Sequence, residues 1–257
     1  MTHEIVAGLR RWRFWVPMGL LDVRLRYRRT VAGPWWAVAG TVLMAVVVGS
    51  LYARLFDADP RAFIPFVATG FAGWSLIASH LSEAPTSLVA RGSLVADQRG
   101  VAVPLLLADG MRRIVMFGHA ALGVALLVWA LDGRPSAALL LLVPNAILVA
   151  AALTAWSIVL AYLGALYRDV HEAVALALVP LLLVTPVLWR PEQFGLDPWW
   201  VRLNPLASLL DLLRAPILGM VPGAASYWIA LAVLTSGAAA ASLATAMGRR
   251  HVSIWVA

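Results

Sequence analysis

The sequence predicts an all-α polytopic membrane protein with six membrane-spanning helices. Six separate apolar stretches make up most of its 257 residues, of which 62% are hydrophobic. A bilayer core of about 30 Å is crossed by about 20 residues in helical form. Inside lipid, backbone N–H and C=O groups must be satisfied within the segment, which favours helices. The expected spans are residues 35–56, 63–81, 114–131, 138–166, 173–189 and 227–247.

The distribution of arginine predicts the orientation. Of the twenty Arg side chains, fourteen lie before the first span, after the sixth, and in the loops after the second and fourth spans. Positively charged loops stay in the cytoplasm. Both termini are therefore expected in the cytoplasm of a bacterium, with the chain in its inner membrane. The late, span-length first apolar run predicts no cleavable signal peptide, and residues 1–257 are expected to form one transmembrane domain.

The N-terminal segment predicts an amphipathic helix that lies in the inner membrane interface. Ile5, Leu9, Trp12 and Val16 recur at helical spacing and form a narrow apolar stripe, with arginines beside or opposite it. Such helices bury their apolar stripe at the level of the head groups. Pro17 is expected to end this helix.

A basic juxtamembrane segment follows. Arg24, Arg26, Arg28 and Arg29 form the densest arginine cluster of the chain, although their spacing does not give one helical face. Such a cluster either contacts lipid phosphate or only sets the orientation of the chain. The sequence leaves both interpretations open.

Two segments between the spans carry further features. Residues 82–113 are polar and helix-compatible, and a loop of this length favours a docking site over an ordinary surface loop. On the opposite side, Asn204 and Pro205 suit the start of a helix. A leucine stripe follows, and Gly219 and Pro222 end the helix. This helix is too short to span the membrane, and an interfacial helix and a gate both remain open.

The aromatic residues and His119 also allow two interpretations. Trp35, Trp36 and Trp189 lie near the expected membrane edges, where tryptophan commonly anchors a span. The alternative is a path lined by rings on which sugar faces pack. His119 is the main ionisable residue expected within a span, and a hydrogen bond to a helix carbonyl explains it more simply than a functional role.

Several kinds of chemistry are absent from this sequence. It has no cysteine, which excludes thiolate sites, and its twenty cationic side chains include no lysine, which excludes an ATP-binding P-loop. It has no G-x-S-x-G motif, and its scattered histidines lack the spacing of metal ligands. A membrane glycosyltransferase is the rival interpretation from another class, and the one D-x-D pair, Asp57 and Asp59, lies in the short loop between the first two spans. We therefore expect no enzyme activity and no metal site.

The order of several motifs resembles one known family. The run from Asp22 to Trp36, which leads into a span ending at 51–56, resembles the start of ABC-2 type permeases that export O-antigen and related lipid-linked polysaccharides. The resemblance continues almost to the end of the chain. Its further parts are residues 66–74, 112–119, 167–169, 185–193, 204–205 and 214–219.

This resemblance implies a transporter subunit with six spans that pairs with a second copy of itself. Two copies of a separate P-loop ATPase would bind ATP and Mg²⁺, so no cofactor is expected on this chain. The substrate implied is a polysaccharide on a polyprenyl diphosphate lipid, with no nucleic acid partner. An ABC-2 permease for a small amphiphile, such as a drug or lipid, is the alternative.

The resemblance also implies roles for particular residues. A coupling helix that contacts the ATPase falls within residues 83–99, and an outer gate falls within residues 192–219. The coupling residues implied are Glu83, Ser87, Arg91, Asp97 and Arg99. The gate residues are Glu192, Asn204, Pro205 and Arg214. The lipid diphosphate would contact Arg24, Arg26, Arg28 and Arg29, which suit phosphate through their forked donors. Aromatics of the glycan path would be Trp35, Trp36, Tyr52 and Trp189.

Overall fold

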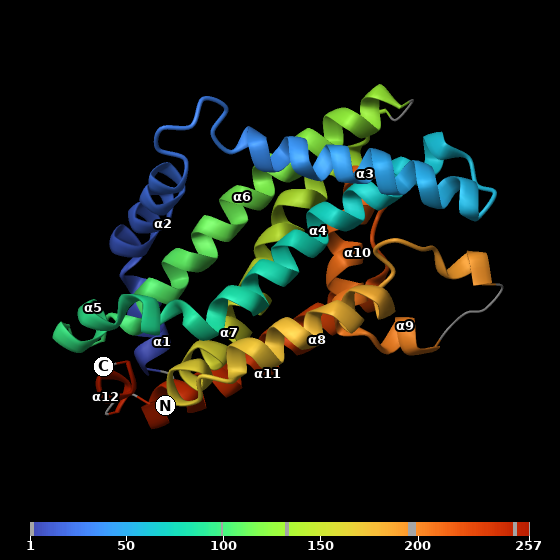
Figure 1. The fold of residues 1–257 in the computed structure, drawn as a ribbon. Coiled ribbons are helices and arrows are strands. Elements are labelled where there is room, and N and C mark those ends of the chain that lie inside the picture. Colours follow the sequence, from blue (N-terminus) through green and yellow to red (C-terminus); the bar gives the residue numbers. More distant parts are fainter. Residues whose placement is uncertain (1–2, 99, 132–133, 195–198, 249–250, 257) are drawn as a thin grey trace.

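The computed structural model describes residues 3–98, 100–131, 134–194, 199–248 and 251–256, and the regular elements in these ranges are all helices (Figure 1). The long helices are α3 (Trp35–Leu55), α4 (Pro60–Ser87), α6 (Ala102–Ala130), α7 (Leu142–Leu166) and α11 (Ala224–Gly248). The shorter α-helices are α1 (His3–Arg10), α2 (Trp12–Arg26), α5 (Gly92–Asp97), α8 (Val170–Val184), α9 (Trp199–Leu203), α10 (Pro205–Ile217) and α12 (Val252–Trp255). Three 3₁₀ turns are η1 (Val89–Arg91), η2 (Ala137–Leu141) and η3 (Pro191–Phe194).

Five described segments are long and apolar enough to cross a membrane: α3, α4, α6, η2 with α7, and α11. The predicted fifth span, residues 173–189, is α8, which has 15 residues and contains Pro180. At 1.5 Å per residue α8 is about 22 Å long. It nevertheless carries the chain from one end of the bundle towards the other (Figure 1). The all-helical membrane fold is thus confirmed, and the six-span topology stays a prediction.

The helices that contain the second and third predicted spans are longer than those spans. The second was expected at residues 63–81, but α4 runs on to Ser87. The third was expected at residues 114–131, but α6 begins at Ala102. The charged residues that marked the predicted ends lie inside the bundle and pair with each other, so the helices continue past them. The presumed long loop is mostly helix, with only η1 and α5 joining α4 to α6.

The N-terminal segment also differs from the prediction. It forms two helices, because the chain breaks at Arg11 rather than at Pro17, which lies inside α2. Proline removes one backbone hydrogen bond from a helix interior. Here the carbonyl left without a donor belongs to Arg13, and both residues are exposed, so water can serve it. Beyond Pro17 the helix is held against α6 by the buried residues Gly19 and Val23.

The centre of the bundle is α4, which packs against α3, α6, α7, α8 and α10. In its most apolar stretch 72% of the residues are buried, against 22% in α3 and α11. Small residues let the neighbours approach closely, as is usual where helices meet in membranes. At the crossing of α4 and α7, Gly164 lies directly against the backbone of Pro85.

The short helix α10 is inserted between the long helices. The sequence predicted a helix that begins at Asn204, and this start is confirmed, since Asn204 caps the amide of Leu206. Ten of the thirteen residues of α10 are buried, and the helix packs against α4, α7 and α11. It is therefore not a helix on the surface of the bundle. Arg214 is buried as well.

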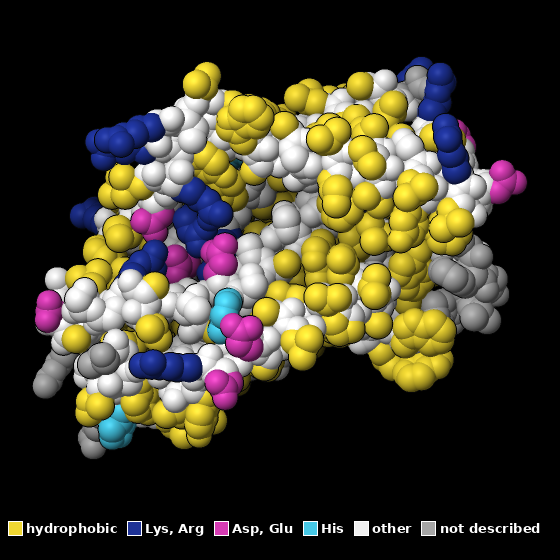
Figure 2. Space-filling model, in the orientation of Figure 1, with side chains coloured by type: hydrophobic (Ala, Val, Ile, Leu, Met, Phe, Trp, Pro, Cys, Tyr) yellow, Lys and Arg dark blue, Asp and Glu magenta, His cyan; other side chains and the backbone are white. Residues whose placement is uncertain are grey.

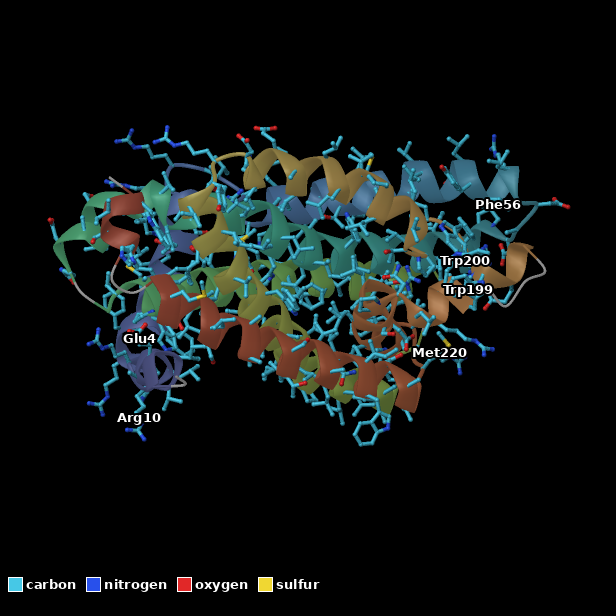
Figure 3. The ribbon with its side chains drawn as sticks, turned by 90° about the horizontal axis from the view of Figure 1, so that it is seen from below. Glu4, Arg10, Phe56, Trp199, Trp200 and Met220 are labelled. Carbon is cyan, nitrogen blue, oxygen red and sulfur yellow. The ribbon has the colours of Figure 1, made fainter. Side chains whose placement is uncertain are left out.

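The two ends of the bundle differ. Helices α1 and α12, which adjoin the termini, lie at the same end as α5 (Figure 1), and α12 packs on α5. Glu4 and Arg10 mark this end in Figure 3, whereas Phe56, Trp199, Trp200 and Met220 mark the opposite end. We call these the α5 end and the α9 end. By the arginine distribution, the α5 end is expected to face the cytoplasm.

The topology can be tested with single cysteines in this cysteine-free chain. Gly223→Cys and Pro135→Cys, both exposed at the α9 end, should react with an impermeant maleimide in intact cells. Ser93→Cys and His251→Cys, both exposed at the α5 end, should react only after the membrane is permeabilised. Labelling of Ser93→Cys in intact cells would reverse the orientation.

The close crossing of α4 and α7 predicts a specific sensitivity. Gly164→Ala places a methyl group on the Pro85 backbone, and such overpacking costs about 1–3 kcal/mol. The melting temperature of the purified protein in detergent should fall by roughly 3–10 °C. Gly118→Ala is the matched control, since a methyl group there meets nothing within 4 Å. Equal melting temperatures for the two variants would contradict the crossing.

Candidate functional site

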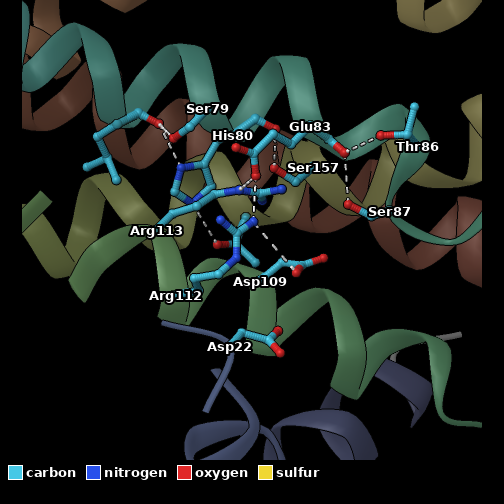
Figure 4. Close-up of polar contacts among 12 residues, drawn as sticks. Asp22, Ser79, His80, Glu83, Thr86, Ser87, Asp109, Arg112, Arg113 and Ser157 are labelled. Atoms are coloured by element: carbon cyan, nitrogen blue, oxygen red, sulfur yellow. Dashed lines mark hydrogen bonds and ion pairs between the residues drawn. The ribbon is translucent and has the colours of Figure 1, made fainter. Parts of the chain in front are cut away.

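Six charged side chains from four elements meet inside the α5 end of the bundle, and we call them the charge network. Figure 4 labels all of them except Arg91. They come from α2, from α4 and the adjoining η1, and from α6. The members are Asp22, Glu83, Arg91, Asp109, Arg112 and Arg113.

Arg91 joins three elements through its guanidinium group. It donates two hydrogen bonds to the Asp109 carboxylate, at 3.0 and 2.9 Å, and one to Asp22 at 2.9 Å. Burial by itself would lower the pKa of Arg91, but the hydrogen bonds and charges of Asp109 and Asp22 outweigh it and raise the pKa. The forked geometry is that of a strong charge-assisted pair. Arg91 therefore fixes η1 to α2 and α6.

Glu83 faces the other two arginines. Arg112 donates a short hydrogen bond to its carboxylate, and Nε of Arg113 lies 3.5 Å from the same oxygen. The Arg113 side chain is only 2% exposed, and neither its Nε nor its NH2 group has a hydrogen-bond partner. A buried charge is costly unless hydrogen bonds satisfy it. Arg113 is therefore the least satisfied member of the charge network.

His80 lies one turn before Glu83 and is completely buried. Its Nδ1 is 2.8 Å from the Leu76 carbonyl oxygen, and its Nε2 is 3.4 Å from the Thr154 hydroxyl. The Ser157 hydroxyl donates to the His80 carbonyl at 2.9 Å. The contacts with Thr154 and Ser157 join α4 to α7 directly behind the charge network.

Three other residues, Ser87, Asp97 and Arg99, were expected to couple to an ATPase. Ser87 donates to the Glu83 carbonyl at 2.9 Å within α4, and Asp97 is exposed at the end of α5. Arg99 lies outside the described residues. The structure thus brings together Glu83, Ser87 and Arg91, but it gives them contacts within the chain and leaves Asp97 facing outwards.

The basic juxtamembrane segment is divided by the structure. All four of its arginines are exposed. Only Arg26 lines a cavity of about 190 Å³, which Glu83, Arg112 and Arg113 also line. Arg28 and Arg29 follow the end of α2 in the link to α3.

At the α9 end, α10 is tied to the turn after α8 through both of its ends. The Asn204 amide donates to the Thr185 hydroxyl at 3.1 Å, and Arg214 lies 3.4 Å from the Val187 carbonyl. The Arg214 guanidinium sits 3.8 Å from the centre of the Phe66 ring, a cation–π contact. Pro205 begins α10, and Glu192 is exposed in η3. Three of the four gate residues thus belong to α10 or its cap.

The four aromatics of the expected glycan path do not share one cavity. Trp35 and Trp36 begin α3, whereas Tyr52 lies near its other end and packs on Phe56 at 5.8 Å. Trp189 donates to the Leu183 carbonyl at 2.8 Å, beyond the end of α8. The four side chains are therefore spread along the bundle from end to end.

Comparison with known proteins identifies the family. The sequence profile of the ABC-2 type transporter domain matches residues 21–218. The chain belongs to the ABC-2 type transporter family. Two relatives from Klebsiella pneumoniae, both named O-antigen export system permease protein RfbA, are 23% and 22% identical over 194 residues. Each match covers 74% of this chain and 74% of the relative.

In this ABC-2 permease, the sequence did not predict the buried positions of His80 and Asp109 or the pairing of Arg112 and Arg113 with Glu83. His119, the histidine that the sequence singled out, is half-buried, and its Nδ1 lies 2.8 Å from the Val115 carbonyl oxygen of its own helix, which fits the simpler interpretation of a hydrogen bond to a helix carbonyl. A signal was present, because His80 and Glu83 are three residues apart, and Asp109 and Arg112 are too. Such spacing places both members of each pair on one helix face.

The charge network predicts energetic coupling between Arg91 and Asp109. Arg91→Gln and Asp109→Asn should each lower the free energy of unfolding in detergent by about 2–3 kcal/mol. The double variant should fall short of the sum by about 1–3 kcal/mol. Asp97→Asn, at an exposed position, should change stability by less than about 0.5 kcal/mol. Strict additivity would show that the pair does not stabilise this ABC-2 permease.

Proposed function

We propose that this chain is the permease subunit of an ATP-driven exporter that moves polyprenyl-diphosphate-linked polysaccharide across the bacterial inner membrane. One observation carries the proposal: within the ABC-2 family, this chain aligns over 194 residues with permeases named for O-antigen export. The exposed arginines near the start of α3 support an anionic substrate, since arginine recognises phosphate through its forked donors.

The ATP would be hydrolysed by a separate chain. This sequence has no lysine for a P-loop, so we propose two copies of a P-loop ATPase as partners, with ATP and Mg²⁺ bound there. A second copy of this chain would complete the translocation path. The exposed apolar side chains of α3, such as Leu43, Val47 and Leu51, are available to lipid or to that second copy.

The charge network suggests how movement of the ATPase would reach the spans. The exposed face of α5, with Asp97 at its end, is available for docking. The adjoining η1 carries Arg91, whose carboxylate partners lie on α2 and α6. A displacement of α5 would therefore act on both helices at once, through charged pairs rather than through flexible chain.

At the other end, α10 is placed to act as the outer gate. Its position between α4, α7 and α11 would control passage there. Its links to the Thr185–Val187 turn mean that α8 and α10 would move together. Spread along the bundle, the four aromatics would offer sugar faces a succession of rings at different depths.

Deletion of the gene tests this function. Cells that make a lipid-linked polysaccharide should accumulate it on the cytoplasmic side and lose it from the surface, as measured by extraction from sealed inside-out and right-side-out vesicles. The wild-type chain should restore export, and the purified chain without its partner should hydrolyse no ATP. Unchanged glycan together with a new sensitivity to small amphiphiles would instead support the alternative, export of a drug or lipid.

A further inference from the structure

The cavity beside the charge network has the composition of an anion site. Its volume is about 190 Å³, and by the same kind of measure one water needs only about 10–15 Å³. The link after α2, together with α3, α4 and α6, forms its walls. Figure 2 shows basic and acidic side chains gathered between α2 and α4, beside a largely hydrophobic surface over α3.

The charges around this cavity are not balanced. Arg26, Arg112 and Arg113 line it with a single carboxylate, that of Glu83, so positive charge exceeds negative by two. The other two acids of the network do not line the cavity: Asp22 and Asp109 both accept hydrogen bonds from Arg91, and Asp109 also forms a longer ion pair with Arg112, at 3.9 Å. An anion that carries one or two charges would complete the balance.

The cavity also has hydrogen-bond donors that lack acceptors. Arg113 is 3% exposed, and its Nε and NH2 groups make no hydrogen bond. Buried polar groups in native proteins are nearly always paired, and unpaired donors on a cation call for an acceptor that carries negative charge. A phosphate group offers several such oxygens and suits a guanidinium fork.

The cavity continues into an apolar groove. A shallow groove of about 360 Å³ between α3 and α4 shares Ala37, Thr41 and Ser75 with it. Beyond these residues, Met44, Phe71 and Trp74 line the groove. A site that is cationic at one end and apolar along its length suits a lipid with an anionic head, and a free phosphate would leave the apolar part empty.

We propose that Arg26, Arg112 and Arg113 bind the phosphate groups of a lipid whose first chain segment lies in the groove between α3 and α4. The shared chemistry is a phosphate-bearing lipid head group. Its assignment to a polyprenyl diphosphate rests on the proposed function. The site differs from the sequence prediction, because it draws on one arginine of the juxtamembrane segment and on two from α6.

Glu83 occupies the place of the ligand in this structure. Its carboxylate holds Arg112 and faces Arg113, as a phosphate oxygen would. The head group must therefore displace Glu83, which lies in the last turns of α4 just before η1 and α5. Binding of the lipid would break the ion pair of Glu83 with Arg112 near the end of α4. Because α4 leads into η1 and α5, this change would reach the segment where the ATPase is proposed to dock.

Binding by the purified full chain, without an ATPase, tests the site. The chain is placed in nanodiscs of phosphatidylcholine and titrated with farnesyl diphosphate, farnesol or inorganic diphosphate in a calorimeter. Farnesyl diphosphate should bind most tightly, since only it fills both the cavity and the groove. Arg113→Gln and Arg26→Gln should weaken it at least about tenfold, and Arg113→Lys, which keeps the charge but loses the fork, should weaken it less.

Two further variants complete the design. Arg10→Gln removes one exposed arginine from α1, away from the cavity (Figure 3), and should bind as the wild type does. Glu83→Gln removes the competing carboxylate and should bind several-fold more tightly. Each variant is first checked for a wild-type elution volume and melting temperature. Weaker binding by a folded Glu83→Gln variant would overturn the role of Glu83 as a stand-in for the ligand.

The outcomes separate this inference from the proposed function. Equal binding by wild type, Arg113→Gln and Arg26→Gln would overturn the site, whatever the deletion strain shows. Binding of inorganic diphosphate as tight as that of farnesyl diphosphate would overturn the role of the groove. If phosphatidylglycerol in the nanodisc blocks the site in an Arg113-dependent way and farnesyl diphosphate does not bind, the phosphate site stands and its link to an export substrate is overturned.

Discussion

The pairing of charges inside the α5 end is the constraint on which the rest of this bundle depends. Asp109, Arg112 and Arg113 lie in α6, and burial of that helix is possible only because Arg91 and Glu83 provide counter-charges. Isolated charges in a low-dielectric interior would cost several kcal/mol each. The network therefore sets how α2, α4 and η1 are placed around α6. Together with Arg26, it leaves a surplus of positive charge beside a cavity.

The two ends of the bundle use different physical means to hold their short helices. At the α5 end, ionised pairs connect η1 to its neighbours. At the α9 end, α10 is held by neutral hydrogen bonds, apolar burial and the contact of Arg214 with Phe66. A helix held by burial moves as a body with its surroundings, whereas charged pairs can exchange one partner for another. This difference suits the proposed outer gate and the proposed inner site for an anionic ligand.

Helix α4 connects the two ends of the bundle mechanically. Its first two turns, which contain Phe63 and Phe66, lie at the α9 end, and its last turns, which contain Glu83 and Ser87, lie at the α5 end. Its close contact with α7 at Gly164 and the hydrogen bonds that join His80 to Thr154 and Ser157 of α7 leave little freedom for independent motion. In an ABC-2 permease, a shift at one end of α4 would therefore move the other end as well.

The sequence by itself determined the class of fold, five of the membrane-length helices, the start of α10 at Asn204 and the family. Those features follow from local patterns: apolar length, arginine distribution, helix caps and the order of motifs. Only the tertiary structure decided that α4 and α6 continue through charged residues and that Pro17 stays inside α2. It also decided that α10 is buried and that Arg26 lines the same cavity as Arg112 and Arg113. The physical reason is that a charged residue ends an apolar stretch of the sequence, but the helix can continue through it when a side chain from another helix neutralises the charge.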